Sequence, residues 1–266
     1  MRLNKTSYDH YRLTMPFHVI EDKQLFYQIQ GHGLSLVLIH SSMQSHHQWQ
    51  YQDSLAEECQ LVLLDLPGHG QSEQLDGEIS IKRLANIIAQ LIQELDMNSF
   101  IPLGHSIGGA ISLQLALDYS ELLEGIILVG TGAKMGVFPA ILEGIRSHYH
   151  EGIELTIGQL GFGSTADPEL VEFVKQECFH CNPEVAYADF NACNNFDVRQ
   201  LLDQIQIPTL VIVGDEDQLA PLKWSQFLAD RISNTELVII ENAGHMVMLE
   251  QPEQFNNAIK SFLQKL

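Results

Sequence analysis

The sequence predicts an α/β protein with three layers, in which helices cover both faces of a mostly parallel sheet. Two observations predict this class. Short, continuously apolar runs are typical of strands buried on both faces of a sheet. Segments with helical spacing lie between most of these runs, which implies right-handed crossovers between parallel strands. The strand runs are residues 34–39, 61–64, 100–103, 125–129, 210–213 and 237–240.

The remaining elements follow from local patterns. Apolar residues 17–20 and 25–29 flank the polar stretch from Glu21 to Lys23, which predicts an opening hairpin. Residues 79–95 are predicted to be helical because their apolar side chains recur three and four positions apart and so share one helical face. Residues 107–117 and 255–263 show the same spacing.

One stretch, residues 134–206, interrupts the alternation of strands and helices. It contains no strand-like run, and its best helical candidates are residues 138–148 and 168–178, the second opened by Asp167 as N-cap and Pro168 at the first helical position. An insertion between two strands, at the sheet edge where ligands bind, is typical of a lid. We therefore expect a core of residues 1–133 and 207–266 and a helical cap of residues 134–206, hereafter the cap segment.

Composition and charge argue against several classes of function and location. The chain has 266 residues, of which 45% are hydrophobic, with 14 Lys and Arg against 34 Asp and Glu and a net charge of −20. This charge disfavours binding to nucleic acid and to anionic membranes. No secretory signal is visible at the amino terminus, no window is apolar enough to span a bilayer, and four cysteines are too few for a disulfide scaffold. We expect a cytoplasmic monomer or homodimer.

The strongest local signal is the sequence Gly104-His105-Ser106-Ile107-Gly108, which lies between a predicted strand and a predicted helix. This G-x-S-x-G pattern is typical of a nucleophile elbow, a strained turn that exposes a serine hydroxyl. The flanking glycines are needed because Cβ atoms there would clash. The helix that follows directs backbone N–H groups toward a developing oxyanion.

A serine nucleophile needs a base, and the base needs an acid that orients it. Asp217 and His245 each follow a predicted strand, so both lie at the same sheet edge as Ser106. Asp215 is the alternative acid, but the first residue after a strand usually turns or caps the chain. We therefore favour Asp217, in the order Ser106, Asp217, His245.

These residues and further motifs resemble the α/β-hydrolase fold of serine hydrolases, in its lidded, carboxylesterase-like branch. The further motifs are Leu38-Ile39-His40, the run from Asp65 to Ser72, Gly214 with Asp217 and Pro221, and Gly244-His245 followed by Glu250, Pro252 and Phe255. The resemblance covers essentially the whole chain.

The resemblance implies a role for each matching position. Ser106 attacks, His245 transfers the proton, and Asp217 holds the imidazole tautomer, while the backbone N–H groups of Ile107 and Ser42 form the oxyanion hole. One departure concerns the oxyanion loop, where the family usually has glycine after His40 and this chain has Ser41. Serine has less backbone freedom than glycine, so the geometry of the second donor is in question, and the Ser42 hydroxyl is an alternative donor.

Other residues near the motifs are assigned to the pocket or to packing. Met43, Phe138 and Met246 are candidates for an apolar substrate pocket, as is Trp49, with core packing as the alternative. The pair Cys178 and Cys181 lacks the further ligands that a closed zinc site needs, so we expect no metal and no cofactor.

The sequence therefore predicts a serine hydrolase that cleaves a small-to-medium carboxylic ester through an acyl-enzyme. The alternatives are a carbon–carbon bond hydrolase, a lactonase, a thioesterase or a cofactor-free haloperoxidase of the same fold, or a ligand receptor built on it. The cap segment is itself acidic, which argues against phosphate-bearing or carrier-linked acyl groups and favours neutral esters. This preference comes from the overall electric field, and a local Arg would defeat it.

Overall fold

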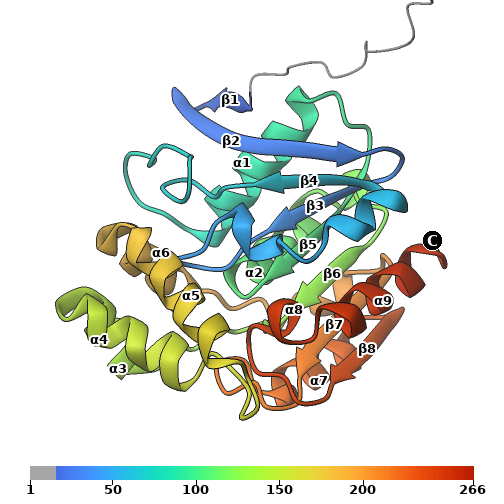
Figure 1. Ribbon diagram of the computed structural model, residues 1–266. Helices are drawn as coiled ribbons and strands as arrows, with labels where there is room; N and C mark the ends of the chain where they lie inside the picture. Colours follow the sequence, from blue (N-terminus) through green and yellow to red (C-terminus); the bar gives the residue numbers. More distant parts are fainter. Residues whose placement is uncertain (1–15) are drawn as a thin grey trace, which may run out of the picture.

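The computed structural model describes residues 16–266, which form an eight-stranded sheet flanked by helices (Figure 1). The strand order is β1-β2-β4-β3-β5-β6-β7-β8. The pairs β1–β2 and β2–β4 are antiparallel and all other neighbours are parallel. The predicted fold class and the opening hairpin are confirmed. The amino-terminal stretch, on which the expectation of no secretory signal rests, lies outside the described residues.

The strands agree with the predicted runs to within about two residues. In chain order they are β1 (Phe17–Ile20), β2 (Lys23–Gly31), β3 (Ser35–Ile39), β4 (Gln60–Leu64), β5 (Phe100–His105), β6 (Ile126–Val129), β7 (Thr209–Gly214) and β8 (Thr235–Ile240). The helices are α1 (Ile81–Glu94), α2 (Ile107–Asp118), α3 (Pro139–Ser147), α4 (Tyr149–Ile153), α5 (Pro168–His180), α6 (Pro183–Asn194), α7 (Leu222–Arg231), α8 (Val247–Glu250) and α9 (Pro252–Leu263).

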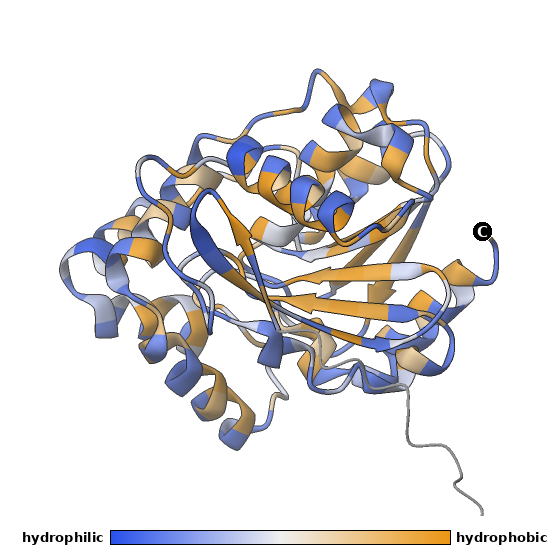
Figure 2. Ribbon diagram, turned by 90° about the horizontal axis from the view of Figure 1, so that it is seen from above, coloured by the Kyte–Doolittle hydropathy of each residue, from blue (hydrophilic) through white to orange (hydrophobic). Residues whose placement is uncertain are grey.

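The sheet separates two hydrophobic cores, because successive side chains of a strand point to opposite faces. In β3, Val37 and Ile39 pack with α1 and α2, whereas Leu36 and Leu38 pack on the face that α9 covers. The view from above shows mostly apolar strands between helices that carry both apolar and hydrophilic residues (Figure 2). This arrangement explains the continuous apolar runs in the sequence.

The cap segment folds into helices between β6 and β7, with a π-helical stretch (Glu154–Gln159) after α4. In Figure 1 its helices α3 to α6 form one group beside the sheet. Asp167 caps α5 as expected, since its side chain accepts the N–H of Glu169. The two ends of the segment pair with each other, because the Val198 N–H donates to the Ala133 carbonyl over 2.8 Å.

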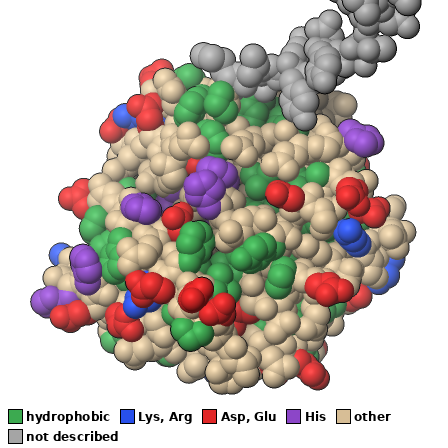
Figure 3. Space-filling model, viewed as in Figure 1, with side chains coloured by type: hydrophobic (Ala, Val, Ile, Leu, Met, Phe, Trp, Pro, Cys, Tyr) green, Lys and Arg blue, Asp and Glu red, His purple; other side chains and the backbone are tan. Residues whose placement is uncertain are grey.

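Four helices of the described residues were not predicted. Helices α4 and α6 lie in the cap segment, α7 lies between β7 and β8, and α8 follows β8. In residues 16–266 no helix has the length and apolarity that crossing a membrane requires. Acidic side chains are spread over the face shown in Figure 3, in keeping with the net charge of −20.

Candidate active site

Ser106 lies at a sharp turn between β5 and α2. Its backbone has φ of 55° and ψ of −112°, a left-handed conformation that is rare for serine. Three hydrogen bonds of the Ser106 backbone hold the turn. Its N–H donates to the Val129 carbonyl over 2.9 Å. Its carbonyl accepts the Thr131 hydroxyl over 2.9 Å and the Gly109 N–H over 3.0 Å. The strain is therefore maintained by the fold.

The glycines on either side of Ser106 are required by close backbone packing. A Cβ atom on Gly104 would overlap the Gly108 carbonyl, and one on Gly108 would overlap the Ile39 carbonyl at the end of β3. The G-x-S-x-G pattern thus allows the turn to press against the neighbouring strand.

His245 and Asp217 meet at the same edge of the sheet. The Nδ1 atom of His245 lies 2.9 Å from Oδ2 of Asp217, and both side chains are buried. The other oxygen of Asp217 accepts the N–H groups of Leu219 and Ala220 over 2.9 and 2.8 Å, which fixes the carboxylate. Nδ1–H therefore donates to Asp217, and Nε2 of His245 is left free to act on a substrate or nucleophile.

Asp215, the alternative acid, points elsewhere. Its Oδ1 accepts the Ala243 N–H over 3.4 Å, a contact that joins the loops after β7 and β8. The structure thus places Asp217, and not Asp215, against His245.

Ser106 and His245 line one pocket. The pocket has a volume of about 60 Å³ and a mainly apolar wall that includes Met43, Phe138 and Met246. No hydrogen bond joins Ser106 Oγ to His245 in the described part of the chain. Trp49 is outside this pocket: it is fully buried and stacks on Phe255, so core packing explains it.

The loop that is expected to form part of the oxyanion hole, hereafter the oxyanion loop, follows β3. Ser42 lines the pocket and Ile107 is the first residue of α2, so the N–H of Ile107 has no partner within the helix. Ser41 does not have a positive φ, and its hydroxyl donates to Gln48 Oε1 over 2.7 Å. Serine is therefore accommodated where the family has glycine. The left-handed residue of the loop is Met43, with φ of 63°.

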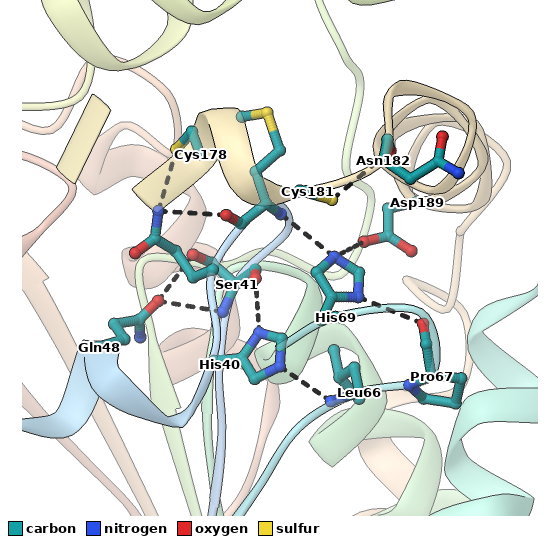
Figure 4. Close-up of polar contacts among 12 residues, drawn as sticks. His40, Ser41, Gln48, Leu66, Pro67, His69, Cys178, Cys181, Asn182 and Asp189 are labelled. Carbon is teal, nitrogen blue, oxygen red and sulfur yellow. Dashed lines mark hydrogen bonds and ion pairs between the residues drawn. The ribbon is translucent and has the colours of Figure 1, made fainter. Parts of the chain in front are cut away.

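Two buried histidines support the oxyanion loop from below (Figure 4). His40 accepts the Leu66 N–H at Nε2 over 2.9 Å and donates from Nδ1 to the Ser41 carbonyl over 2.7 Å. Burial, with a smaller contribution from His69, lowers the pKa of His40 to about 3, so His40 is neutral. The ring thereby bridges the loops after β3 and β4.

The second histidine, His69, connects this loop to the cap segment. Its Nε2 atom lies 3.3 Å from the Met43 N–H nitrogen and 3.2 Å from Oδ2 of Asp189 on α6, and Nδ1 faces the Pro67 carbonyl over 3.2 Å. Burial disfavours the charged ring, but the charge and hydrogen bond of Asp189 outweigh it and raise the pKa of His69 well above 6.5. Protonated His69 pairs with Asp189, whereas neutral His69 accepts from Met43.

The loop that carries His245 is also tied to the cap segment. Glu250 accepts the N–H groups of Gly163 and Gly244 over 2.7 and 2.9 Å, and the His245 N–H donates to Gly161 over 3.1 Å. Burial raises the pKa of Glu250 to about 6, although both N–H groups oppose the shift. Glu250 thus positions His245 relative to the cap segment.

Sequence reasoning missed three groups around the site. His105 lies behind His245, with ring centroids 4.5 Å apart, and burial followed by the nearby His245 lowers its pKa well below 6.5. His69 and Asp189 are 120 positions apart in the chain, and no local pattern connects them. Glu250 belongs to a quoted motif, but its hydrogen bonds to the loops could not be read from spacing.

The cysteines of the cap segment are buried thiols. Cys193 lines the pocket, but burial raises its pKa well above 9, which removes it as a rival nucleophile. Cys178 accepts the Gln44 side-chain N–H over 3.0 Å. Within residues 16–266 no group of three or more His, Cys, Asp or Glu side chains is arranged to hold a metal ion.

The chain is similar to known proteins along most of its length. The model of the "Alpha/beta hydrolase family" matches residues 36–258. The chain is 26% identical over 259 residues to a pimeloyl-[acyl-carrier protein] methyl ester esterase of Vibrio atlanticus, covering 91% of this chain and 98% of that one. It is 29% identical over 224 residues to 3-oxoadipate enol-lactonase 2 of Acinetobacter baylyi, with coverage of 82% and 84%. A thermophilic esterase structure from Thermogutta terrifontis matches with a TM-score of 0.83 and 28% identity, covering 91% of this chain and 94% of that chain.

Proposed function

This chain belongs to the alpha/beta hydrolase family, and from that premise we propose that it is an ester-cleaving hydrolase that uses Ser106, His245 and Asp217 as a catalytic triad. The observation that carries the proposal is the His245–Asp217 hydrogen bond of 2.9 Å in the pocket that the strained Ser106 also lines. The esterase names of several relatives support the same class of reaction.

The proposed reaction proceeds through an acyl-enzyme. Ser106 Oγ attacks the ester carbonyl carbon while Nε2 of His245 takes the hydroxyl proton. The tetrahedral oxyanion accepts hydrogen bonds from the N–H groups of Ser42 and Ile107. When the intermediate collapses, the bond to the alcohol oxygen breaks and the alcohol leaves with the proton from His245.

Water completes the cycle. His245 takes a proton from the water as its oxygen attacks the acyl carbon, and the acid is released when the bond to Ser106 Oγ breaks and the serine regains its proton. Asp217 remains ionised and keeps the Nδ1–H tautomer of His245 throughout.

The apolar wall and small volume of the pocket support a small-to-medium ester as substrate. The lactonase among the relatives makes a cyclic ester the second candidate, since hydrolysis of a lactone needs the same groups. Carbon–carbon bond hydrolysis, thioester hydrolysis, cofactor-free haloperoxidation and ligand reception are the remaining alternatives.

We further propose that the cap segment is a lid on a core of residues 1–133 and 207–266. Val137, Phe138 and Ile141 of the cap segment line the pocket, so its movement would open or close the way to Ser106.

The test is hydrolysis of p-nitrophenyl esters of graded acyl length, with a fluorophosphonate label to locate the nucleophile. We expect multiple turnovers that Ser106→Ala abolishes. Asp217→Asn should lower kcat about 10⁴-fold, whereas the matched variant Asp215→Asn should retain kcat to within a few-fold. The reverse ranking would refute the assignment of the acid. A single slow turnover that leaves a persistent adduct would favour the receptor alternative.

A further inference from the structure

A second cavity, of about 410 Å³, lies beside the candidate active site and is lined by cations and aromatic rings. Its lining residues are Ala133, Lys134, Gly136, Arg199, Lys223, Trp224 and Phe227. The chain has only 14 Lys and Arg against 34 Asp and Glu, and no carboxylate is among these lining residues. We call this cavity the basic pocket.

The positive charge of the basic pocket is only partly neutralised. Asp197 lies 2.7 Å from Arg199 and 3.7 Å from Lys134. Hydrogen bonds from Arg199 lower the pKa of Asp197 to about 2, so it carries one negative charge. Lys223 has no ion-pair partner among residues 16–266. Two of the three positive charges therefore remain for a ligand.

The basic pocket shares part of its wall with the pocket of the candidate active site. Gly136 and Trp224 line both cavities. The Trp224 side chain is held against the backbone, because a Cβ atom on Gly132 would lie 3.1 Å from its ring. A substrate with its ester at Ser106 would therefore have to pass Trp224 to reach the cations.

We propose that the basic pocket binds a free carboxylate of the substrate, so that the preferred esters carry a carboxylate remote from the scissile bond. The proposal rests on the proposed function and deepens it. Lys223 offers a mobile ammonium group, and Arg199 offers the N–H groups that its two hydrogen bonds to Asp197 leave unused. Both groups suit a carboxylate. Trp224 and Phe227 supply apolar surface for the connecting methylene groups. A single negative charge also meets less repulsion from the −20 protein than a phosphate dianion would.

Binding of a carboxylate in the basic pocket would favour negatively charged esters, whereas the acidity of the cap segment alone favours neutral esters. The net charge acts at long range and is screened by salt. The basic pocket acts within contact distance of the ligand. The local charge therefore decides which substrates are bound.

The test compares two p-nitrophenyl esters of equal chain length: the hexanoate, which is neutral, and the mono-ester of adipate, which ends in a carboxylate. We expect a higher kcat/KM for the adipate ester, by a lower KM, and a preference that shrinks as salt is added. Lys223→Gln and Arg199→Gln should each reduce the ratio of the two kcat/KM values about five- to tenfold. Lys82→Gln, on α1, is the charge-matched control and should leave the ratio unchanged.

Binding is measured separately in the inactive variant Ser106→Ala. Adipate should change the Trp224 fluorescence saturably, and the double variant with Lys223→Gln and Arg199→Gln should lose this change. The inference is overturned if the hexanoate ester and the adipate ester have equal kcat/KM values. It is also overturned if neither Lys223→Gln nor Arg199→Gln changes the ratio of these values. If neither ester is cleaved, the proposed function fails, and the titration with adipate alone decides whether the basic pocket binds carboxylates.

Discussion

The buried pair of His69 and Asp189 leads to a prediction about stability and pH. The two residues are 1% and 3% exposed, and Nε2 of His69 lies 3.2 Å from Oδ2 of Asp189. Asp189→Asn removes the charge that holds the proton on His69. Breaking a buried pair costs about 3–5 kcal/mol, and we expect the lower end, about 3 kcal/mol, because neutral His69 can accept the Met43 N–H.

This cost converts into a melting temperature through the unfolding entropy, about 2.1 cal/mol/K per residue. For 266 residues that entropy is about 0.56 kcal/mol/K. The expected decrease in Tm is therefore about 5 °C.

The sign of the pH dependence follows from the raised pKa of His69. Its stabilising contribution is complete below the unfolded value of 6.5 and is lost as the pH rises through the folded pKa, which lies well above 6.5. The difference in Tm between wild type and Asp189→Asn should therefore be largest near pH 6 and should shrink in alkaline solution. The groups that face His69 are Asp189 from α6, Cys181 before it, and His40 after β3.

Thermal unfolding followed by circular dichroism across this pH range provides the measurement. The control is Asp203→Asn, which breaks the exposed contact with Arg231 at 3.2 Å and should cost less than about 1 kcal/mol. A Tm difference for Asp189→Asn that is independent of pH, or no larger than that of the control, would refute the reasoning.

Three further predictions concern the contacts of the cap segment. Because the pKa of Glu250 is raised from 4.5 to about 6, the free energy of unfolding should fall as the pH rises through this window, by about 1 kcal/mol after solvent screening. In urea unfolding, Glu250→Gln should flatten this pH dependence. A variant with the wild-type pH dependence would contradict the prediction. Gly244→Ala places a Cβ atom on the backbone of Gly163, so we expect a loss of about 2 kcal/mol and of most esterase activity, and wild-type Tm would count against the contact. In limited trypsin digestion the first cuts should fall within residues 134–206, and early cuts in the core would argue against a lid.

The sequence predicted those elements whose burial follows a regular pattern. The strands were found because both of their faces are buried, and α1 because its apolar residues form one stripe. Helix α7 was missed because only Ser225 and Leu228 are buried in it, too few to form a stripe. In α6 the buried inner face includes the charged Asp189, which conceals the periodicity.

The candidate site likewise contains residues that the sequence predicts and contacts that it does not predict. Ser106, Asp217 and His245 were predicted because each follows a strand at one sheet edge, and the fold of the chain brings such positions together. The contacts of His69 and Glu250 and the basic pocket were not predictable, because they join segments that only the folded chain places side by side. Local spacing carries no information about such pairs.

The hydrogen bond between Val198 and Ala133 has a consequence for which parts of the sequence can be replaced during evolution. Because the cap segment leaves and re-enters the core at hydrogen-bonded neighbours, its interior can be lengthened, shortened or exchanged without altering the register of β6 and β7. Ser106 then keeps its place on the core while the pocket wall is replaced, provided that the new segment restores the contacts of Gly161 and Gly163 with the loop of His245. Lys134 and Arg199 stand at the two ends of this exchangeable part, so a graft made between them would change the pocket wall and leave these two cations of the basic pocket in place.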